Sequence, residues 1–380
     1  MKIGYVIDKF PKVSETFIYN EVKGLNKKQD LRVFSIEDVD EEVSEDIEIV
    51  YGEKFYRKGI EGIGSFLKGN LLDRSVIETY YNMVASKFRK HAQDLNIIHR
   101  HFPTNSVVYY LANELEIPYT ITTHARDIFS EERYGHLEEL LKGSAKIVTI
   151  SDYNKRYLIN EFKVQPEKVK KIHMGIDTEK FSPSPPQGDI THILTVARLV
   201  EKKGICYGIK SVARIADDHP NLEYNIIGVG PLEEDLKDLV HKLNLENRVN
   251  LLGRVSEKKL LEEYEKADIF LLPCIVASDG DRDGIPVVLM EGMAMEKIVI
   301  STSVSGIPEL IEDNKNGIIV DPNQPEKIAQ KITQIVEGEL DIGSLCRNAR
   351  DKVRKDFNIQ DQVAGMEEMF REVVSDEQNF

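Results

Sequence analysis

The sequence predicts an α/β protein with two doubly wound domains, and two observations lead to this fold class. A chain of 380 residues is longer than one hydrophobic core usually serves. The proline-rich stretch SPSPPQGD at residues 182–189 divides it nearly in half, and the segments on both sides alternate apolar strands with amphipathic helices. That alternation is typical of a parallel sheet covered by helices.

Short apolar runs predict the strands in order along the chain. The first half opens with KIGYVI and the second with HILTVA. Further strands are predicted at residues 97–101, 119–123, 146–150, 224–227, 269–272 and 298–301. We therefore expect two Rossmann-like domains that face a central cleft, at residues 1–183 and 190–357. The last helical stretch, from about Gln360 to Val374, is expected to cross back, so that residues 358–380 pack on the first domain.

The cysteines and the apolar runs indicate the cellular compartment of the protein. Cys206, Cys274 and Cys346 lack any metal-binding spacing and are typical of free thiols in a reducing compartment. The longest apolar run, residues 269–277, is too short to span a bilayer, and no signal peptide is visible at the start of the sequence. We expect a cytoplasmic protein, or one bound peripherally to the inner face of the membrane.

The charge pattern bears on the class of partner. A net charge of −15 without a basic stripe argues against nucleic acid. In the first half, however, basic residues alternate with aromatic and apolar ones, which indicates either an ordinary solvated surface, the commoner case, or a surface that docks on anionic lipid. The residues concerned are Lys54, Arg57, Lys58, Lys68, Arg89 and Lys90, interleaved with Phe55, Tyr56, Phe66 and Leu67.

A basic pair follows the first strand of the second half. Open α/β sheets bind ligands at the carboxyl ends of their strands, which makes Arg198 and Lys203 candidates, since they follow HILTVA and precede Gly204 and a helical segment. An arginine, a lysine and a helix N-terminus are the donors that a diphosphate requires. The alternative is that both residues make surface salt bridges, for example with Glu201.

Glu291 lies in a helix that is otherwise apolar. Residues 287–295 read as a buried helix with Pro286 at its first turn. The neighbours of Glu291 at three or four residues' distance are apolar, so no local cation neutralises it, and Asp283 precedes it by eight residues. Because an unpaired buried carboxylate is costly, it must find donors elsewhere, such as the paired hydroxyls of a ligand.

A glycine pair leaves a nicotinamide enzyme open as an alternative. Gly228 and Gly230 begin a dinucleotide fingerprint, but Glu233 stands where the third glycine belongs. At the distance expected for a ribose-binding acid the chain has Glu246 and Arg248, which is an ambiguous combination.

Metal sites receive little support from residue spacing. The aspartates before Gly284 suggest a calcium loop, but its bidentate glutamate would fall at Met290 rather than Glu291. A paired-aspartate metal site for a sugar nucleotide stays open. His99 and His101 share one face of a strand without a third ligand at zinc spacing. The motifs of zinc proteases, serine hydrolases and P-loop enzymes are absent from the sequence.

His124 ends the strand YTITT and opens HARDIF, near the expected crevice of the first domain, where a histidine is as often structural as functional. His124 becomes a candidate functional residue because it belongs to a set of segments spread over nearly the whole chain. These are KVSETFI, IHRHF, TTHARDI, KIHMGIDTEKF, TVARLVEKKG, IIGVGPLEEDL, VNLLGRV, DGIPVVLMEGMA and GIPELIEDNKNGIIV. In this order they resemble the retaining glycosyltransferases of family four, which have the two-domain GT-B architecture. The opening PKVSETFI and DRDGIPVVLMEGMA are most similar to the branch that assembles bacterial exopolysaccharides on lipid carriers.

The resemblance implies a role for each matching residue. Glu291 would bind the nucleotide ribose, and Asp283 would bind hydroxyls of the donor sugar. Arg198 and Lys203 would hold the donor diphosphate, and His124 would contact the sugar near the reacting carbon. Further donor contacts would come from Gly230, Val255, Gly284, Ile285, Pro286 and Val287.

Three positions depart from the pattern of the family. Asp283 stands where glutamate is common, and it could instead cap the helix that follows. Ala125 stands where a glycine usually follows the histidine, and Pro11 to Thr16 replace a glycine-rich loop. In that loop we expect contacts with the acceptor or a phosphate from Ser14, Glu15 and Thr16.

The implied reaction is anomer-retaining transfer of a sugar from a UDP- or GDP-sugar to a glycan, a lipid-linked or a small-molecule acceptor, without a metal cofactor. The alternatives are a nucleotide-sugar epimerase or hydrolase of the same architecture, and a catalytically silent nucleotide-binding module. Neither the base nor the donor sugar can be read from the residues.

Overall fold

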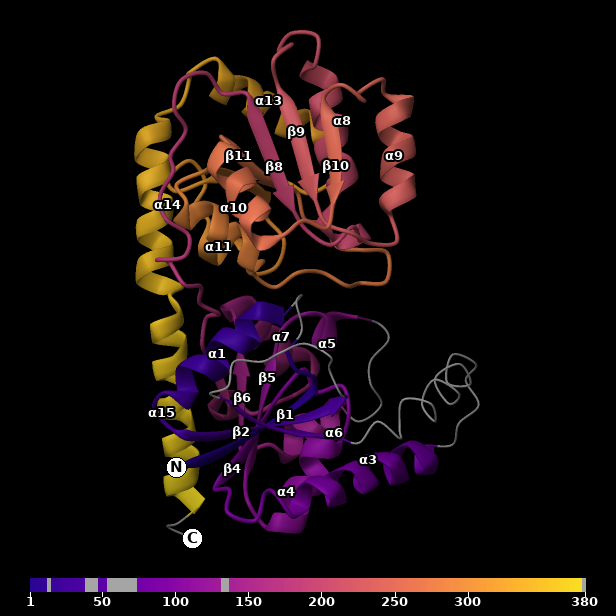
Figure 1. Cartoon of the computed structure of the whole chain (residues 1–380), viewed down its shortest axis with the longest axis vertical. Helices are drawn as coiled ribbons and strands as arrows, with labels where there is room; N and C mark the ends of the chain where they lie inside the picture. Colours follow the sequence, from indigo (N-terminus) through magenta and orange to yellow (C-terminus); the bar gives the residue numbers. More distant parts are fainter. Residues whose placement is uncertain (12–14, 38–46, 53–73, 131–136, 378–380) are drawn as a thin grey trace.

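The computed structural model describes residues 1–11, 15–37, 47–52, 74–130 and 137–377. They form two α/β domains stacked along the long axis of the molecule (Figure 1). Each domain is built on one parallel sheet, which confirms the predicted fold class.

The sheet of the first domain has seven strands in the order β3-β2-β1-β4-β5-β6-β7. These strands are β1 (Lys2–Lys9), β2 (Asp30–Glu37), β3 (Glu48–Tyr51), β4 (Ile97–His101), β5 (Tyr119–Thr123), β6 (Lys146–Thr149) and β7 (Val169–Lys171). Its helical segments are α1 (Thr16–Asn26), α3 (Arg74–Arg89), α4 (Val107–Leu115), α5 (Arg126–Phe129), α6 (Leu137–Gly143), α7 (Asp152–Glu161) and η2 (Pro166–Lys168).

The sheet of the second domain has six strands in the order β10-β9-β8-β11-β12-β13. These strands are β8 (His192–Val196), β9 (Glu223–Ile227), β10 (Val249–Gly253), β11 (Ile269–Leu272), β12 (Ile298–Thr302) and β13 (Ile318–Val320). Its helical segments are η3 (Glu201–Lys203), α8 (Ile205–Ile215), α9 (Glu233–Lys242), α10 (Glu257–Lys266), α11 (Val287–Ala294), α12 (Ile307–Leu310), α13 (Pro325–Val336) and α14 (Ile342–Asp356). The last helix of the chain is α15 (Ile359–Glu377). All the strands predicted from apolar runs are present, with ends that shift by two residues at most.

Apolar side chains on both faces of each sheet explain the helical layers. In β1, Ile3, Tyr5 and Ile7 pack on one face with α1 and α15, whereas Val6 packs on the other face with α3 and α4. Successive side chains of a strand point to opposite faces, so a continuous apolar run buries both. In the second domain, α8, α9 and α13 cover one face and α10, α11 and α14 the other.

The chain passes between the domains twice, and the two passages lie together. Ile176 and Asn358 form a parallel β-bridge at this point. The backbone is packed so closely that a Cβ on Gly175 would lie 2.2 Å from the carbonyl oxygen of Asn358. Ile176 and Phe181 already pack in the core of the second domain, ahead of the proline-rich stretch.

After the second passage the last helix returns to the first domain. Helix α14 packs against α11, while α15 packs against α1 and places Val363 and Phe370 in the core under the first sheet (Figure 1). Over the described ranges, no helix combines the length and the apolar character needed to cross a bilayer.

Candidate functional site

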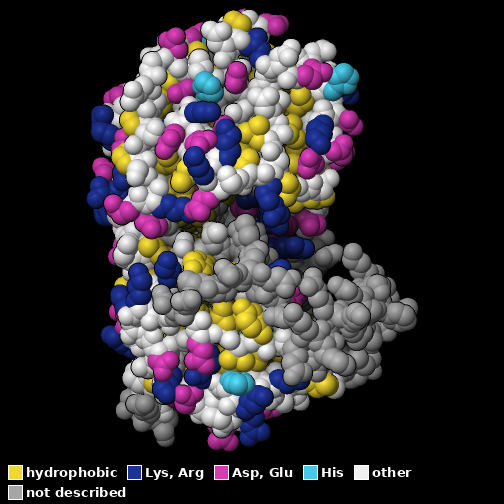
Figure 2. Space-filling model, viewed as in Figure 1, with side chains coloured by type: hydrophobic (Ala, Val, Ile, Leu, Met, Phe, Trp, Pro, Cys, Tyr) yellow, Lys and Arg dark blue, Asp and Glu magenta, His cyan; other side chains and the backbone are white. Residues whose placement is uncertain are grey.

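The carboxyl ends of the two sheets meet where the domains touch. A Cβ on Gly284, in the loop before α11, would lie 3.2 Å from the carbonyl oxygen of His124 at the end of β5. It would also lie 2.6 Å from the Cδ1 atom of Ile150, just after β6. The fold thus brings together His124 and the α11 loop, which are far apart in the sequence. In Figure 2, basic and acidic side chains both lie along the rim of the second domain that faces the first.

Glu291 is half-buried on α11 and has a partner that sequence reasoning missed. The hydroxyl of Tyr264, from α10, donates a hydrogen bond to its Oε2 atom at 2.9 Å. Burial raises the pKa of Glu291, and the bond from Tyr264 opposes that rise. The expectation that Glu291 finds a donor outside its own stretch of helix is met by Tyr264, which lies on another helix. Tyr264 lies on the apolar face of α10, which is typical of an ordinary core residue.

Asp283 lies in a cluster of opposite charges. Its Oδ2 atom is 2.7 Å from Nζ of Lys203, and its Oδ1 atom is 3.5 Å from Nζ of Lys202. Although burial opposes ionisation, these two ammonium groups lower the pKa of Asp283 to about 2. The N-cap of α11 is Pro286, and no side chain caps this helix, so the alternative role of Asp283 as a helix cap is wrong.

Lys203 does not make the surface salt bridge that was the alternative for it. Its ammonium group pairs with Asp283, and this charge keeps the pKa of Lys203 raised even though burial lowers it. Glu201 instead accepts hydrogen bonds from the backbone and the hydroxyl of Ser278. A Cβ on the next residue, Gly204, would lie 1.9 Å from the carbonyl oxygen of Pro273, so this loop is locked against the end of β11.

Arg198 follows β8 and is exposed. It forms no ion pair with a described residue, and its charge acts on Lys203. The loop that carries it is bonded to the loop after β9, where a Cβ on Gly228 or Gly230 would lie 1.7 or 2.4 Å from the carbonyl oxygens of Ala197 and Leu199. These glycines are therefore needed for close packing between the two loops.

The ribose-binding acid of a nicotinamide site has no support in the fold. Glu246 accepts a hydrogen bond from exposed His241 at 2.5 Å. It precedes β10 and so lies at the amino end of that strand, away from the edge at which ligands bind.

The start of α11 and the end of β10 contribute backbone to the same edge. Gly284, Ile285 and Pro286 are buried, and α11 begins at Val287 without a side-chain cap. The first amides of a helix have no carbonyl partner within it, so they are available to an anion. Val255 follows β10 and packs, half-buried, against the apolar cluster around Phe270.

His124 is buried between two aromatic rings. Its ring centroid is 4.2 Å from that of Phe102 and 5.0 Å from that of Phe17. Its Nε2 atom lies 3.1 Å from Nδ1 of His101, and its Nδ1 atom has no hydrogen-bond partner among the described residues. Burial lowers the pKa of His124 well below its usual range. Asp127 holds its backbone, accepting from the amide of His124 at 3.1 Å.

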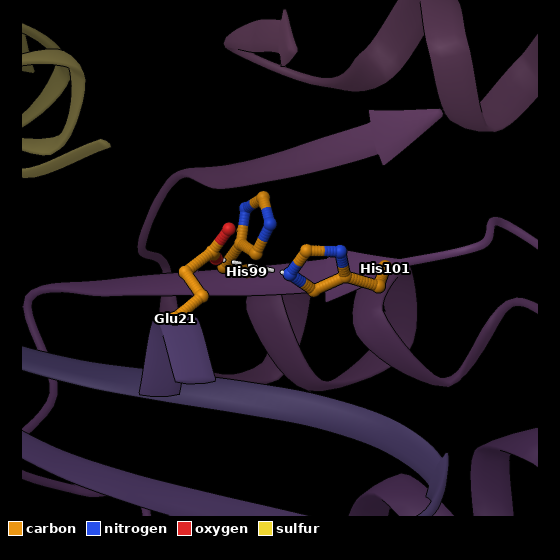
Figure 3. A group of neighbouring side chains, drawn as sticks. All are labelled: Glu21, His99 and His101. Atoms are coloured by element: carbon orange, nitrogen blue, oxygen red, sulfur yellow. Dashed lines mark hydrogen bonds and ion pairs between the residues drawn. The ribbon is translucent and has the colours of Figure 1, made fainter. Parts of the chain in front are cut away.

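Tertiary structure adds a third side chain to the histidine pair on β4. Glu21 from α1 lies beside His99 and His101, with potential ligand atoms of all three within 4.8 Å (Figure 3). The ring nitrogens of His99 already bond to the hydroxyls of Thr120 and Thr122 at 2.8 and 3.0 Å. A metal ion would have to displace these bonds, which favours a hydrogen-bonded network.

The structure locates only part of the predicted first loop and basic surface. Ser14 lies outside the described residues, as do the predicted lipid-docking residues between 53 and 73. Glu15 precedes α1, and Thr16 is the exposed first residue of that helix. Arg89 and Lys90 are exposed at the end of α3.

Arg282 joins the two domains beside the site and was not predicted from the sequence. Its guanidinium lies 4.6 Å from the ring centroid of Phe129 and 5.9 Å from that of Tyr157. Its Nη1 atom donates to the hydroxyl of Tyr153 at 3.2 Å. Glu309 makes a second contact between the domains, since its carboxylate accepts from the first two amides of α7.

Comparison with known proteins assigns both halves to glycosyltransferase families. Residues 14–180 match the family described as Glycosyltransferase Family 4, and residues 177–356 match Glycosyl transferases group 1. A putative colanic acid biosynthesis glycosyltransferase of Escherichia coli (strain K12) is 35% identical over 244 residues, which is 62% of this chain and 60% of that protein. An amylovoran biosynthesis glycosyltransferase of Erwinia amylovora is 40% identical over 196 residues, 50% of this chain and 48% of that protein. The chain thus matches about half to three fifths of the length of these relatives.

Solved structures share the fold at low sequence identity. A glycosyltransferase from Rickettsia africae ESF-5 has a TM-score of 0.77 at 20% identity, covering 98% of both chains. Anabaena HepE in complex with UDP has a TM-score of 0.75 at 16% identity, covering 98% of this chain and all of that one. Because the two family matches together run from residue 14 to residue 356, and the fold agrees over the whole chain, this protein belongs to the group 1, family 4 glycosyltransferases of GT-B architecture.

Proposed function

We propose that the protein transfers a sugar from a nucleoside-diphosphate sugar to an acceptor, with retention of the anomeric configuration. The observation that carries this proposal is that Lys203 and exposed Arg198 follow β8, and that α11, the helix of Glu291, follows the neighbouring strand β11, so that both segments start from the carboxyl edge of the second sheet. A carboxylate for ribose hydroxyls and fixed cations for a diphosphate are the groups that a nucleotide-sugar donor requires.

Each part of the donor has a candidate partner. Glu291, oriented by Tyr264, accepts from the ribose hydroxyls. Arg198 and Lys203 hold the diphosphate together with the first amides of α11. His124 and Asp283 face the sugar, on opposite sides of the boundary between the domains.

Fixed cations would stabilise the leaving group in the proposed mechanism. As the glycosidic bond breaks, negative charge develops on the diphosphate, and preorganised cations stabilise it without further rearrangement. We therefore propose that catalysis needs no metal cofactor. The acceptor attacks from the face that the diphosphate leaves, which retains the anomeric configuration.

The names of similar proteins support a choice of donor and acceptor. Anabaena HepE was solved with UDP, which puts UDP-sugars first among the donors to test. The two relatives named above serve colanic acid and amylovoran biosynthesis, which supports a glycan or lipid-linked acceptor of exopolysaccharide type. A cytoplasmic protein with peripheral contact to the inner membrane face would suit such an acceptor.

Thermal stabilisation by nucleotides tests the donor site. The intact protein is heated with UDP, GDP, ADP or NAD, each with and without EDTA, beside Glu291→Ala and Arg198→Ala. We expect one nucleoside diphosphate to raise the Tm, with EDTA having no effect and both variants losing the shift. Glu326→Ala and Arg214→Ala are matched controls, because these residues form an exposed ion pair on α13 and α8. Stabilisation by NAD alone, or loss of every shift in EDTA, would contradict the proposal.

Turnover separates the remaining alternatives. The nucleotide identified by thermal stabilisation is supplied as several nucleotide sugars, with and without lipid-linked glycan acceptors, and the anomeric configuration of the product is read by NMR. An acceptor-dependent α-linked product from an α-linked donor is expected. A product that forms equally well without the acceptor would indicate an epimerase or hydrolase. Binding without turnover on any donor would indicate a silent nucleotide-binding module.

A further inference from the structure

We propose that Glu21 and His101 are positioning residues that fix the tautomer of His124, so that its Nδ1 atom accepts a hydrogen bond from a hydroxyl of the donor sugar. The inference rests on the proposed transferase function, because it needs a sugar beside His124. Neither Glu21 nor His101 would touch the substrate. They would act through the ring of His124.

The observation is a continuous chain of buried polar groups from α1 to the end of β5. Glu21 Oε1 lies 3.0 Å from Nε2 of His101, the contact drawn in Figure 3. On the other side of the same ring, Nδ1 of His101 lies 3.1 Å from Nε2 of His124. All three residues are at most 5% exposed, so water does not compete for these atoms.

The first step is that Glu21 acts only as an acceptor. Tyr5 donates its hydroxyl to Oε1 at 2.6 Å, and the amide of Gln362 donates to Oε2. Burial opposes ionisation, but the hydrogen bonds from His101, Tyr5 and Gln362 hold the pKa of Glu21 below its usual range. An ionised carboxylate has no hydrogen to give, so the ring of His101 must carry a hydrogen on Nε2.

The second step is that the tautomer of His101 determines the tautomer of His124. In this proposal His101 is neutral, so that with its only hydrogen on Nε2 its Nδ1 atom has a lone pair and can only accept. The hydrogen between the rings therefore belongs to Nε2 of His124. Because the pKa of His124 lies well below its usual range, that ring is neutral and carries no second hydrogen. Its Nδ1 atom is left as an acceptor.

The third step is that this acceptor lacks a partner within the described protein. Nδ1 of His124 is buried and makes no hydrogen bond to the described residues. A buried polar atom without a partner is costly, and in native proteins it calls for an explanation such as a ligand. The backbone carbonyl of the same residue lies close to Gly284 in the α11 loop, so His124 is a residue of the boundary between the domains. A sugar hydroxyl is a donor of the required kind.

The tautomers can be measured directly in the wild-type protein. Long-range ¹H–¹⁵N correlation spectra of the intact chain, labelled at histidine, distinguish protonated from bare ring nitrogens, and His124→Asn and His101→Asn assign the signals. We expect His101 and His124 both to be neutral with hydrogen on Nε2. A cationic His101, or hydrogen on Nδ1 of His124, would overturn the proposal without any variant of Glu21.

Three substitutions then separate the tautomer effect from simple loss of structure. Glu21→Met removes the acceptor and should leave the tautomers mixed, whereas Glu21→Gln keeps an acceptor oxygen and should restore the wild-type spectrum. Tyr5→Phe is the matched control, since it removes another donor to Glu21 but leaves the bond between Glu21 and His101 intact. If Tyr5→Phe shifts the histidine signals as much as Glu21→Met, the network is only structural.

Kinetics show whether the tautomer matters for turnover. Donor hydrolysis is measured with UDP-glucose, UDP-galactose and GDP-mannose, and KM and kcat are compared. Glu21→Met should lower kcat with little change in the KM for the donor, by about the 10- to 100-fold that is typical when a metal-binding histidine loses its hydrogen-bond partner, and Glu21→Gln should recover most of it. Equal kcat in wild type and Glu21→Met, despite altered tautomers, would refute the role in positioning the sugar.

Failure of the inference can be told apart from failure of the proposed function. If the wild type turns over no donor but shows the expected tautomers, the transferase proposal fails and so does the role assigned to the sugar hydroxyl. If the wild type turns over a donor but shows hydrogen on Nδ1 of His124, only the inference about Glu21 and His101 fails.

Discussion

At the scale of a residue, a single hydrogen bond determines how Glu291 is oriented. Its carboxylate lies on an otherwise apolar helix, and the hydroxyl of Tyr264 is the donor that orients it. A hydrogen bond to an ionised group in a partly buried place is stronger than one between neutral groups. This hydrogen bond stabilises the partly buried carboxylate. In the proposed site it also fixes the orientation in which the carboxylate oxygens accept from a ligand.

Tyr264→Phe should weaken binding of the stabilising nucleoside diphosphate about tenfold, because Glu291 loses the donor that orients it, and should cost about 1 kcal/mol of stability. Isothermal titration and urea unfolding measure the two effects. Tyr224→Phe is the control, since Tyr224 is equally buried and bonds to Thr195 at 2.7 Å in the same domain. Equal losses of nucleotide affinity in both variants would contradict the role of Tyr264.

Asp283 gives the stability of the fold a dependence on pH. Its pKa is about 2 in the fold, below the ordinary value of 3.8, so it stabilises the folded state above pH 4 and loses this contribution as the pH falls from 4 towards 2. The lost amount is about 2 kcal/mol. Asp283→Asn should therefore be less stable than wild type at pH 7, and the difference should shrink below pH 4. Urea unfolding at several pH values measures it, and a constant difference would contradict the pairing with Lys203.

At the scale of elements, the site depends on short loops that follow strands. The loop after β8 is held by the loop after β9 and by the end of β11, through approaches that only glycine allows. Gly204 has a φ of +63°, in the left-handed region, and it directly follows Lys203. Gly204 thus fixes the backbone position of Lys203, from which the ammonium group extends.

Gly204→Ala should destabilise the second domain more than the same change at Gly188. Gly188 also has a positive φ, +78°, but a Cβ there would meet nothing within 4 Å, so its cost is only the backbone strain of about 1 kcal/mol. At Gly204 the clash with the carbonyl of Pro273 adds about 1–3 kcal/mol. Thermal unfolding of both variants measures the difference, and similar costs would show that the loop can relax.

At the scale of the whole molecule, the domains are joined by two adjacent passages and a small set of contacts beside the site. The bridge between Ile176 and Asn358 lies at one side, and Arg282 and Glu309 reach across the boundary. Helix α15 is bound to the first domain rather than the second, which leaves the passages as the natural place to bend. Closing of a two-domain cleft over a ligand is a common step in catalysis.

Arg282→Ala should favour an open arrangement of the domains without unfolding either one. A cation over aromatic rings contributes about 1–2 kcal/mol when it is partly desolvated, and losing it changes the ratio of closed to open molecules about 5- to 30-fold. Small-angle X-ray scattering should show a larger radius of gyration, with an unchanged Tm. Arg214→Ala, which breaks only an exposed ion pair, is the control. An unchanged radius in Arg282→Ala would mean that other contacts hold the domains.

The strands and the helix of Glu291 could be predicted because their signals are local. Apolar runs such as 269–272 and the apolar stretch from 287 to 295 mark β11 and α11 without knowledge of the rest of the fold. Residues that follow strands could be nominated for the same reason, since the carboxyl ends of parallel strands share one edge. Arg198, Lys203 and His124 came from this rule and from the family resemblance.

The sequence by itself thus determined the fold class, the strands and a set of polar residues at strand ends. Only the tertiary structure decided the partners of the candidate residues, Tyr264 for Glu291 and Glu21 for His101, and it added Arg282 with the aromatic side chains around it. The physical reason is that hydrophobic periodicity depends on neighbours within a few residues. A hydrogen bond or an ion pair between distant segments depends on distances that exist only after the sheets have formed and their helices have packed.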